Sequence, residues 1–419
     1  MGWDGCLMWA VVEARGIERV PESERQNKHS IGLLLLWFSV NIALTTIPLG
    51  MLGQQIFTLS FADTVRTMLG FLIIGCFCVV FIATLGPKTG MRTMVITRYS
   101  YGYWGGAIIS LLNVLTQLGL SVIVVILAGQ VLHNINTNML LVVGCYIRLN
   151  LFYWIRLPTP LRTLRMDSYD NNIPNDLGYW WTCWYAHHSG FDINRQKPLE
   201  DPPGRLRAAD ALSYGGIMFA SSSGWAPVAA DFNCRLTSNT PKKKIFWLTF
   251  FGVLLPIFFV GILGAALVTV PQYSEAFEEG DAAGVLKKGF EPWGGGGDFI
   301  LVLMALSVVG NNTRILGCFW IVIVTEEHYI FRRKGGMLGG YDFRVYDSPK
   351  ELPLGLAAII ASCISVAGIV IGMAQVWFIG PVAAKIGPFG GDLGFEFAAV
   401  FAAVLFPPLR YLEIRRWGR

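Results

Sequence analysis

The chain has 419 residues and a formal net charge of +5, and 53% of its residues are hydrophobic while only 15% are charged. Soluble globular chains carry about 25% charged residues, so this composition excludes a soluble protein. The mean hydropathy of +0.50 leads to the same conclusion. We therefore expect an all-α polytopic membrane protein.

Composition and short motifs exclude several other classes. Basic side chains gather in short loops, where the positive-inside rule explains them better than contact with nucleic acid does. None of the eight cysteines forms a CxxC pair, so the sequence predicts no disulfide framework and no zinc site. His187 and His188 are adjacent, which suits exposed loop residues better than metal ligands. We find no nucleophile–base pair and no phosphate-binding loop, so we expect neither enzyme activity nor a cofactor.

Long apolar segments recur along the chain. A spanning helix needs about 20 mostly apolar residues, and about nine segments approach that criterion. In chain order they are 32–52, 67–85, 108–132, 139–154, 211–230, 245–270, 299–324, 353–379 and 395–407.

The charges of the connecting segments indicate how these spans are oriented. Basic residues in several of them favour the cytoplasmic side, whereas an acidic loop is expected to lie outside. The predicted organisation begins with a cytoplasmic N-terminal segment at 1–31, four spans in 32–154, a polar segment at 155–210, and a broken helix with a further span in 211–271. An external loop at 272–297 and one span in 298–325 follow. The chain ends with a cytoplasmic loop at 326–352, two last spans in 353–407 and a basic cytoplasmic tail at 408–419.

This organisation contains a conflict at residues 155–210. Charged and amide side chains occur throughout the segment, so no part of it is apolar enough to cross a bilayer. Four spans return the chain to the cytoplasm, and a single fifth span would place the basic run 242–244 outside. Either the charge rule fails downstream or one span is missing, and we favour the missing span.

The segment 221–233, SSSGWAPVAADFN, interrupts an apolar run. Its Gly224 and Pro227 break any helix that would continue through it. Inside a bilayer, unpaired backbone groups are tolerated mainly where they face protein or line a polar cavity. Transporters hold their substrates at such broken helices, so the interruption predicts a binding site near Trp225.

Several longer motifs carry a resemblance to a known family. They are EARGIERVP at 13–21, WFSVN at 37–41, RYSYG at 98–102, GWAPVAAD at 224–231, VGNN at 309–312 and EEHYIFRRKGG at 326–336. These motifs resemble the fungal purine-cytosine permeases of the nucleobase:cation symporter family. The resemblance implies a LeuT-type helical bundle of about twelve spans, of which roughly the first ten form two inverted repeats around a substrate held by interrupted helices one and six.

By this resemblance the bundle is incomplete, with about nine of twelve spans. Residues 155–210 stand in place of helix 5, and we interpret them as a segment read out of frame through a splicing or gene-model error. The alternative is a polar cytoplasmic insertion. After Asn312 most of helices 8 to 10 is missing, so 298–325 is predicted to be one fused helix 8/10 span. Arg314 would lie near its middle, where an unpaired cation costs about 2.5–3.5 kcal/mol or more.

A planar nucleobase requires an aromatic face for stacking and polar groups along its edge. Trp225 beside Gly224 suits the stacking role, with freed backbone groups as donors and acceptors; the alternative is a tryptophan at the membrane interface. Asn311 and Asn312 are uncharged amides within an apolar run. They are candidates to bind the base edge, and the alternative is hydrogen bonding between helices.

Further candidates lie in the first and third spans and after the broken helix. Ser39 and Asn41 precede the Pro-Leu-Gly sequence at 48–50, which could unwind the first span, although local side-chain bonds to the backbone explain them equally well. Gln117 is the clearest polar residue of the third span. Asp231 is a candidate coupling or gating carboxylate, and the alternative is a helix cap.

The resemblance implies a plasma-membrane transporter with a cytoplasmic N-terminus. It would import purine nucleobases and cytosine by proton symport and alternating access, with cytosine, adenine, guanine or hypoxanthine as substrates. The proton would be the coupling ion, and no nucleic acid would take part. The alternative is a defective or non-transporting membrane product of the same family that lacks helices 5 and 8–9.

The frame hypothesis predicts a specific transcript. Sequencing the spliced message is expected to show that the chain is read in a different frame from about Trp154 until the frame returns near Gly190 to Pro198, with an apolar span encoded in the corrected frame. A message that confirms the present frame throughout would contradict the hypothesis and leave the polar insertion.

Overall fold

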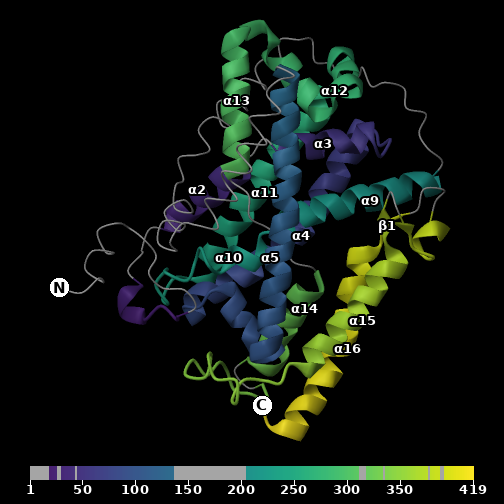
Figure 1. The fold of residues 1–419 in the computed structure, drawn as a ribbon. Coiled ribbons are helices and arrows are strands. Elements are labelled where there is room, and N and C mark those ends of the chain that lie inside the picture. The colour runs from purple at the N-terminus through teal and green to yellow at the C-terminus, as the bar shows by residue number, and fades with distance from the viewer. Residues whose placement is uncertain are drawn as a thin grey trace.

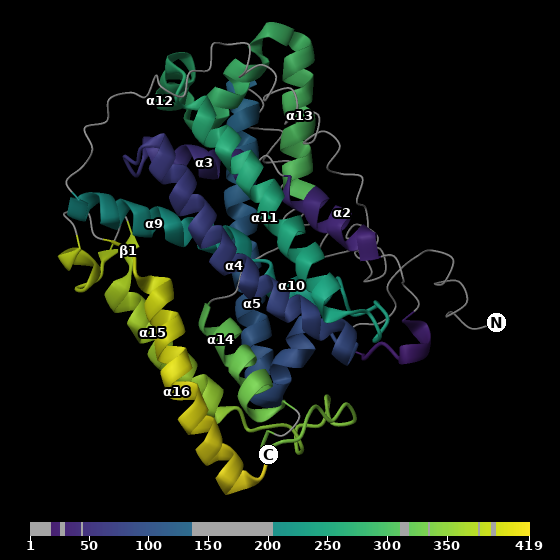
Figure 2. The same cartoon turned by 180° about the vertical axis from the view of Figure 1, so that it is seen from behind.

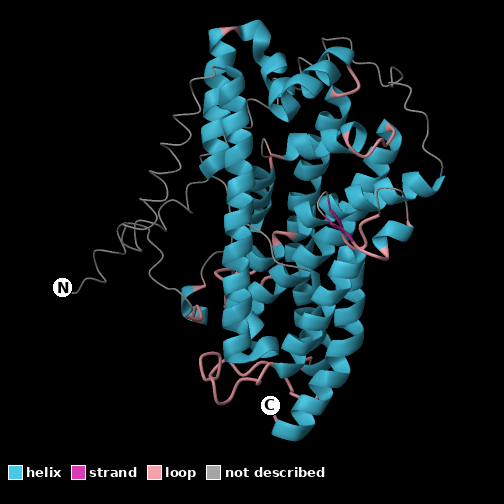
Figure 3. Cartoon of the chain, turned by 45° about the vertical axis from the view of Figure 1, so that its right-hand side comes forward, coloured by secondary structure: helices cyan, strands magenta, loops and turns pink. Residues whose placement is uncertain are grey.

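The structure, a computed structural model, describes residues 18–25, 30–42, 45–135, 204–310, 318–333, 336–375, 378–386 and 391–419. Helices make up nearly all of this part, with one small pair of strands (Figure 3). The helices form one elongated bundle, and α9 runs across it in both views of the ribbon (Figures 1 and 2).

The first apolar segment is interrupted near its middle. It forms α2, Ser30–Asn41, and α3, Thr46–Gln55, and their axes differ by 53°. Pro48 lies in the first turn of α3, where its missing N–H has no intrahelical partner to lose. The interruption therefore falls directly after Asn41, ahead of Pro48 and Gly50, which both lie within α3.

The next helix, α4, covers Phe61–Thr89 and is stabilised at both ends. The Ser60 side chain accepts a hydrogen bond from the Asp63 N–H at its start. At its end, the buried Arg25 guanidinium donates to the carbonyls of Pro87 at 2.9 Å and Thr89 at 3.3 Å. This Arg25 comes from the N-terminal segment that contains η2, Glu22–Glu24, so that segment is fastened to the end of α4.

A kink divides α5, Thr93–Ile135, near its start, at Gly102. The φ of Gly102 is 71°, and a Cβ there would lie 2.1 Å from the Pro353 carbonyl oxygen. Only glycine fits this positive φ and this close approach. The kink separates a short first segment of α5 from the long part that contains the predicted third span.

The second interruption occurs where the sequence predicts it. Helix α9, Gly204–Ser223, is followed by a turn at Gly224 and Trp225 and by the short helix α10, Ala226–Ala229. Pro227 lies in the first turn of α10, a position that requires no backbone N–H.

Helix α11, Lys242–Leu267, packs against α2, α3 and α4. Small residues allow α3 and α11 to approach closely, because a Cβ at Gly50 would lie 1.9 Å from the Gly261 carbonyl oxygen and one at Gly264 would lie 2.0 Å from that of Ile47. Such small-residue contacts are typical of helix packing in membranes. They hold α3, the second half of the first interrupted segment, against α11.

Residues 272–297 do not form the irregular loop that we expected. Helix α12, Pro271–Phe290, and the short η5, Glu291–Trp293, occupy most of the segment, and α13, Gly295–Gly310, begins within it. The acidic residues suggested a loop, but they lie beside buried residues of α12 that include Tyr273, Leu286 and Phe290. This apolar face supports a helix although the mean hydropathy is low.

Within the predicted fused span at 298–325, the structure describes helical residues on either side of 311–317, which lie outside the described residues. Helix α13 packs against α5, and α14, Cys318–Glu326, packs against α16. A π-helical turn, Glu327–Phe331, continues α14, so the predicted loop at 326–352 begins with helix. The junction that contains Arg314 lies outside the described residues. Residues 155–203 of the predicted replacement segment also lie outside them. The fused-span and frame hypotheses therefore stay predictions.

The C-terminal part is a pair of packed helices joined by a hairpin. Helix α15, Leu356–Gly372, leads into strands β1, Ala374–Gln375, and β2, Phe378–Ile379, which pair antiparallel with Ala374 opposite Ile379. The short η7, Ala383–Lys385, and then α16, Gly394–Trp417, follow. The two helices lie side by side (Figures 1 and 2).

The tail predicted at 408–419 belongs largely to α16, which continues to Trp417. The basic residues do not end the helix, because Arg410 is fully buried and paired rather than solvated. Three helices in the described ranges are long and apolar enough to cross a bilayer, α4, α11 and α16, and the bent pair α2–α3 makes a fourth if it is one span. The predicted span 139–154 lies outside these ranges.

A buried charge network fastens the base of the bundle. Glu327 accepts from Arg332 Nε at 2.8 Å and from Arg410 Nε at 3.0 Å. Arg410 also reaches Glu413 at 3.4 Å, and Glu413 accepts from the Gly355 N–H at 2.8 Å. The network thus joins the end of α14, α16 and the start of α15.

Neutralising the central carboxylate should destabilise the fold strongly. Glu327→Gln leaves two buried guanidinium groups without their shared anion, and breaking such a buried pair costs about 3–5 kcal/mol. The matched control is Asp347→Asn, which removes the partially exposed Arg98–Asp347 pair and is expected to cost about 1 kcal/mol or less. Thermal unfolding of the purified protein in detergent measures both, and equal losses would contradict the assignment.

Candidate functional site

The two helix interruptions meet at one buried hydrogen bond. Trp225, in the turn between α9 and α10, donates from its indole Nε1 to the side-chain oxygen of Asn41 at 2.6 Å. Asn41 is the last residue of α2. Both side chains are covered, because Trp225 is 2% exposed and Asn41 is 3% exposed. The structure therefore brings together two residues that the sequence places in the site independently.

Aromatic rings surround this bond. Trp37 meets Trp225 edge to face, with ring centroids 5.4 Å apart and an interplanar angle of 90°. Phe232 lies 5.2 Å from Trp37 and 6.4 Å from Trp225. Edge-to-face pairs at such separations are favourable beyond the area that they bury, so the three rings form a rigid aromatic wall at the second interruption.

Sequence reasoning missed Trp37 and Phe232. The spacing of Trp37 could have identified it, since it lies one helical turn before Asn41 and therefore on the same face of α2. Phe232 directly follows Asp231 in a motif that drew attention for its glycine, proline and carboxylate. Its role depends on the turn after α10, which no periodic pattern reveals.

The other predicted site residues are placed less directly. Gly224 is buried in the turn, and its N–H donates to the Ala220 carbonyl at 3.0 Å, closing the last turn of α9. Ser39 is half-buried on α2, but residues two positions apart do not share a helix face, so Ser39 points away from the face of Asn41. The structure thus groups Gly224, Trp225 and Asn41 and sets Ser39 to one side.

The contacts of three predicted polar residues lie outside the described part of the structure. Gln117 lies within α5, and its side chain is outside the described set. Asn311 and Asn312, like His187 and His188, lie outside the described residues altogether. Binding of the base edge by these amides stays a prediction.

Asp231 caps the first turn of another helix. Its carboxylate accepts from the Thr93 N–H at 2.7 Å, and the Thr93 hydroxyl in turn accepts from the Ala230 N–H at 3.1 Å. Thr93 begins α5, where an anionic group is favoured by the helix dipole. The exchange of bonds ties the end of the broken helix to the start of α5.

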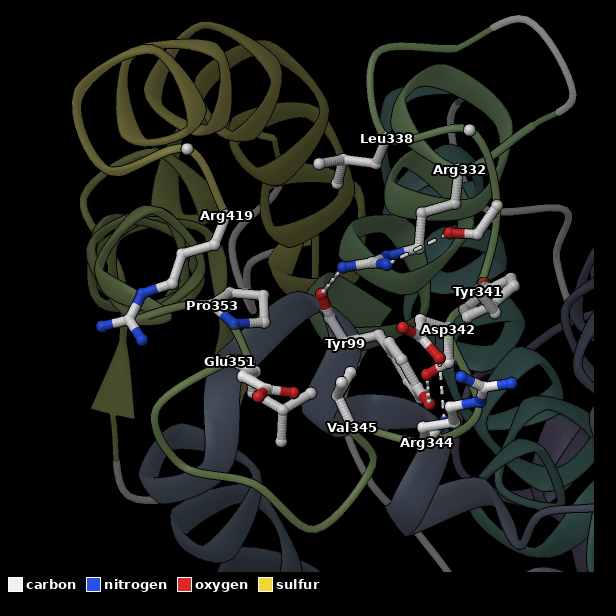
Figure 4. Close-up of a pocket in the computed structure, with 14 residues that line it drawn as sticks. Tyr99, Arg332, Leu338, Tyr341, Asp342, Arg344, Val345, Glu351, Pro353 and Arg419 are labelled. Atoms are coloured by element: carbon white, nitrogen blue, oxygen red, sulfur yellow. Dashed lines mark hydrogen bonds between the residues drawn. The ribbon is translucent and has the colours of Figure 1, made fainter.

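A separate cavity of about 590 Å³ lies at the base of the bundle (Figure 4). Its walls come from the loop after α14 and the ends of α5 and α16, and they carry Arg332, Arg344 and Arg419 together with Asp342 and Glu351. None of the predicted site residues lines it. We place the candidate site at the interruptions, because the aromatic wall and the bond between Trp225 and Asn41 are found there.

The capping role of Asp231 leads to a testable difference between two variants. Asp231→Asn keeps a side-chain oxygen that accepts from the Thr93 N–H, so the unfolding temperature should stay near that of the unmodified chain. Asp231→Ala removes the acceptor and should lose about 0.5–2 kcal/mol of stability. Thermal unfolding in detergent compares the two variants. An equal loss of stability in both would show that the hydrogen bond at this cap does not stabilise the fold.

Comparison with known proteins shows which permeases the chain is similar to. A family model for permeases of cytosine/purines, uracil, thiamine and allantoin matches residues 19–155. The purine-cytosine permease fcyB of Emericella nidulans is 28% identical over 97% of this chain and 90% of its own length. The purine-cytosine permease FCY2 of Saccharomyces cerevisiae is 26% identical over 97% of this chain and 87% of its own length.

Other matches extend the comparison to the fold. The vitamin B6 transporter TPN1 of Saccharomyces cerevisiae is 26% identical over 97% of this chain and 88% of its own length. The inward-facing conformation of Mhp1 matches with a TM-score of 0.58 at 12% identity, over 96% of this chain and 95% of Mhp1. A closed conformation of this nucleobase-cation-symport-1 transporter, with bromovinylhydantoin bound, matches with a TM-score of 0.53 at 13% identity, over 93% of each chain.

The fold is therefore the LeuT-type helical bundle expected from the motifs. The sequence relatives are fungal permeases and transporters rather than enzymes. The chain is a multi-pass membrane transporter that is similar over most of its length to purine-cytosine permeases, and its residues 19–155 match the model for permeases of cytosine/purines, uracil, thiamine and allantoin.

Proposed function

We propose that this transporter imports purine nucleobases and cytosine by proton symport with alternating access. The observation that carries the proposal is the meeting of two helix interruptions at Trp225 and Asn41 beside an aromatic wall. In transporters built from inverted repeats, substrates are held where interrupted helices come together. The relatives fcyB and FCY2, named as purine-cytosine permeases, support this substrate class.

The chemistry of the site suits a flat heterocycle. A nucleobase stacks on the face of Trp225, and polar side chains serve its edge. Gln117, Asn311 and Asn312 supply further donors and acceptors, whereas Ser39 lies on the other face of α2. Cytosine, adenine, guanine and hypoxanthine are the proposed substrates, because each offers a planar ring with a hydrogen-bonding edge.

Coupling and location complete the proposal. A proton is the coupling ion, with no other cofactor, and Asp231 is the carboxylate that gates movement between the broken helix and α5. Its bond to Thr93 supports this role, because it joins the end of the broken helix to the start of α5. The chain resides in the plasma membrane with its N-terminus in the cytoplasm, in line with the positive charges of its short loops.

Uptake of labelled cytosine or adenine by cells without their own nucleobase transporters tests the proposal. Trp225→Ala should raise the KM about 5- to 150-fold, because stacking of a base on an aromatic ring contributes about 1–3 kcal/mol. The matched control is Trp247→Ala, since Trp247 is 53% exposed on α11 and should leave uptake unchanged. Uptake should also fall as the external pH rises and in the presence of a protonophore. A Trp225→Ala variant with the original KM would contradict the proposal.

Two observations favour alternatives to nucleobase import, namely a different substrate and a non-transporting product. The same uptake assay distinguishes these alternatives. TPN1 is a vitamin B6 transporter, and a planar pyridine ring also stacks on tryptophan, so uptake of labelled pyridoxine in place of cytosine would assign that substrate. The family model stops at residue 155, where the polar segment begins. Uptake by a frame-corrected chain but not by this chain would favour the non-transporting product.

A further inference from the structure

The orientation of the Asn41 amide is fixed by its partners. Its Nδ2 donates to the Trp37 carbonyl at 2.7 Å, and its Oδ1 accepts from Trp225 Nε1 at 2.6 Å. A carbonyl can only accept and an indole N–H can only donate. The reversed amide would face the Trp37 carbonyl with its oxygen and the indole N–H with its own N–H groups, so only one orientation satisfies both.

This geometry makes Asn41 unavailable to a substrate. Both of its polar groups have protein partners, the Trp37 carbonyl and the Trp225 indole N–H. A nucleobase could bind the amide only if Trp225 released it, and release would leave a buried indole N–H without an acceptor. An unsatisfied buried donor costs about 1–3 kcal/mol, so the bond to Trp225 is the favoured state of this amide.

Trp225 lies in the turn between two helices and its side chain is 2% exposed. Its ring contacts include the edge-on ring of Trp37 and the ring of Phe232. The bond to Asn41 adds a directional restraint, because it fixes where the indole N–H points. A ring held in one orientation before binding spares the cost of immobilising it when a ligand stacks on it.

We propose that Asn41 is a positioning residue: its amide holds the Trp225 indole in the orientation that receives the substrate, across the two helix interruptions. This role rests on the proposed function, and it differs from the sequence-based interpretation of Asn41 as a substrate ligand. In this arrangement the Trp225 ring contacts the substrate, and Asn41 sets the orientation of that ring.

A double-mutant cycle tests the role. Trp225→Phe keeps an aromatic ring but removes the donor, and Asn41→Leu keeps the volume but removes the amide. Each single variant should raise the KM for labelled cytosine about 3- to 10-fold, the scale of one hydrogen bond, with little change in the maximal rate. The KM of the double variant should be no higher than that of the more impaired single variant, because both substitutions remove the same bond. Independent, multiplicative effects on KM would overturn the inference.

Trp320→Phe is the matched control. Trp320 is buried and donates from its indole Nε1 to the Thr97 hydroxyl at 3.0 Å, between α14 and α5. This variant loses the same kind of bond away from the interruptions, so it should lower the unfolding temperature while leaving the KM unchanged. A KM increase equal to that of Trp225→Phe would show a general effect of lost stability and overturn the positioning role.

A second readout separates this inference from the proposed function. The unfolding temperatures of the four members of the cycle, measured in detergent without substrate, should also be non-additive. A wild-type chain with no uptake of any nucleobase would overturn the proposed function alone. In that case the unfolding temperatures decide whether Asn41 holds Trp225, with additive losses overturning the inference and non-additive losses supporting it.

Discussion

Within an apolar bundle, every interruption of a helix must find new partners for the polar groups that it frees, and this constraint shapes the whole site. The chain breaks after Asn41 and again at Gly224, and one indole-to-amide bond joins the two breaks. The close glycine contacts between α3 and α11, and the packing of α11 on α2 and α4, hold the first break in place. The reciprocal bonds between Thr93, Ala230 and Asp231 fasten the second.

The short first segment of α5, ahead of the kink at Gly102, connects the site to the base of the bundle. Asp231 holds its first N–H, and Trp320 on α14 donates to Thr97 one turn later. Arg332, a member of the buried charge network, donates to the Tyr99 carbonyl at 3.2 Å. A movement of this segment would therefore reach both the broken helix and the charge network. That linkage suits a transporter in which access depends on rigid elements rocking against one another.

The membrane class, the interruption at Gly224 and Trp225 and the family follow from the sequence, because composition, a Gly/Pro break and long motifs are local signals. The direct bond between Asn41 and Trp225 is beyond sequence reasoning, since the two residues are 184 positions apart and neither shows its partner by spacing. The helical character of 271–290 was missed because its charges lower the mean hydropathy while its buried face is still apolar. The burial of Arg410 depends on Glu327, another distant partner.

Photolabelling tests the central claim most directly, namely that the paired interruptions form the substrate site. The purified transporter is irradiated with a photoreactive adenine analogue, with and without excess cytosine, and the labelled peptide is identified by mass spectrometry. The account predicts cytosine-protected labelling of the peptide that contains Gly224 and Trp225. Protected labelling confined to the arginine-lined cavity beside Arg332 and Arg344 would contradict it.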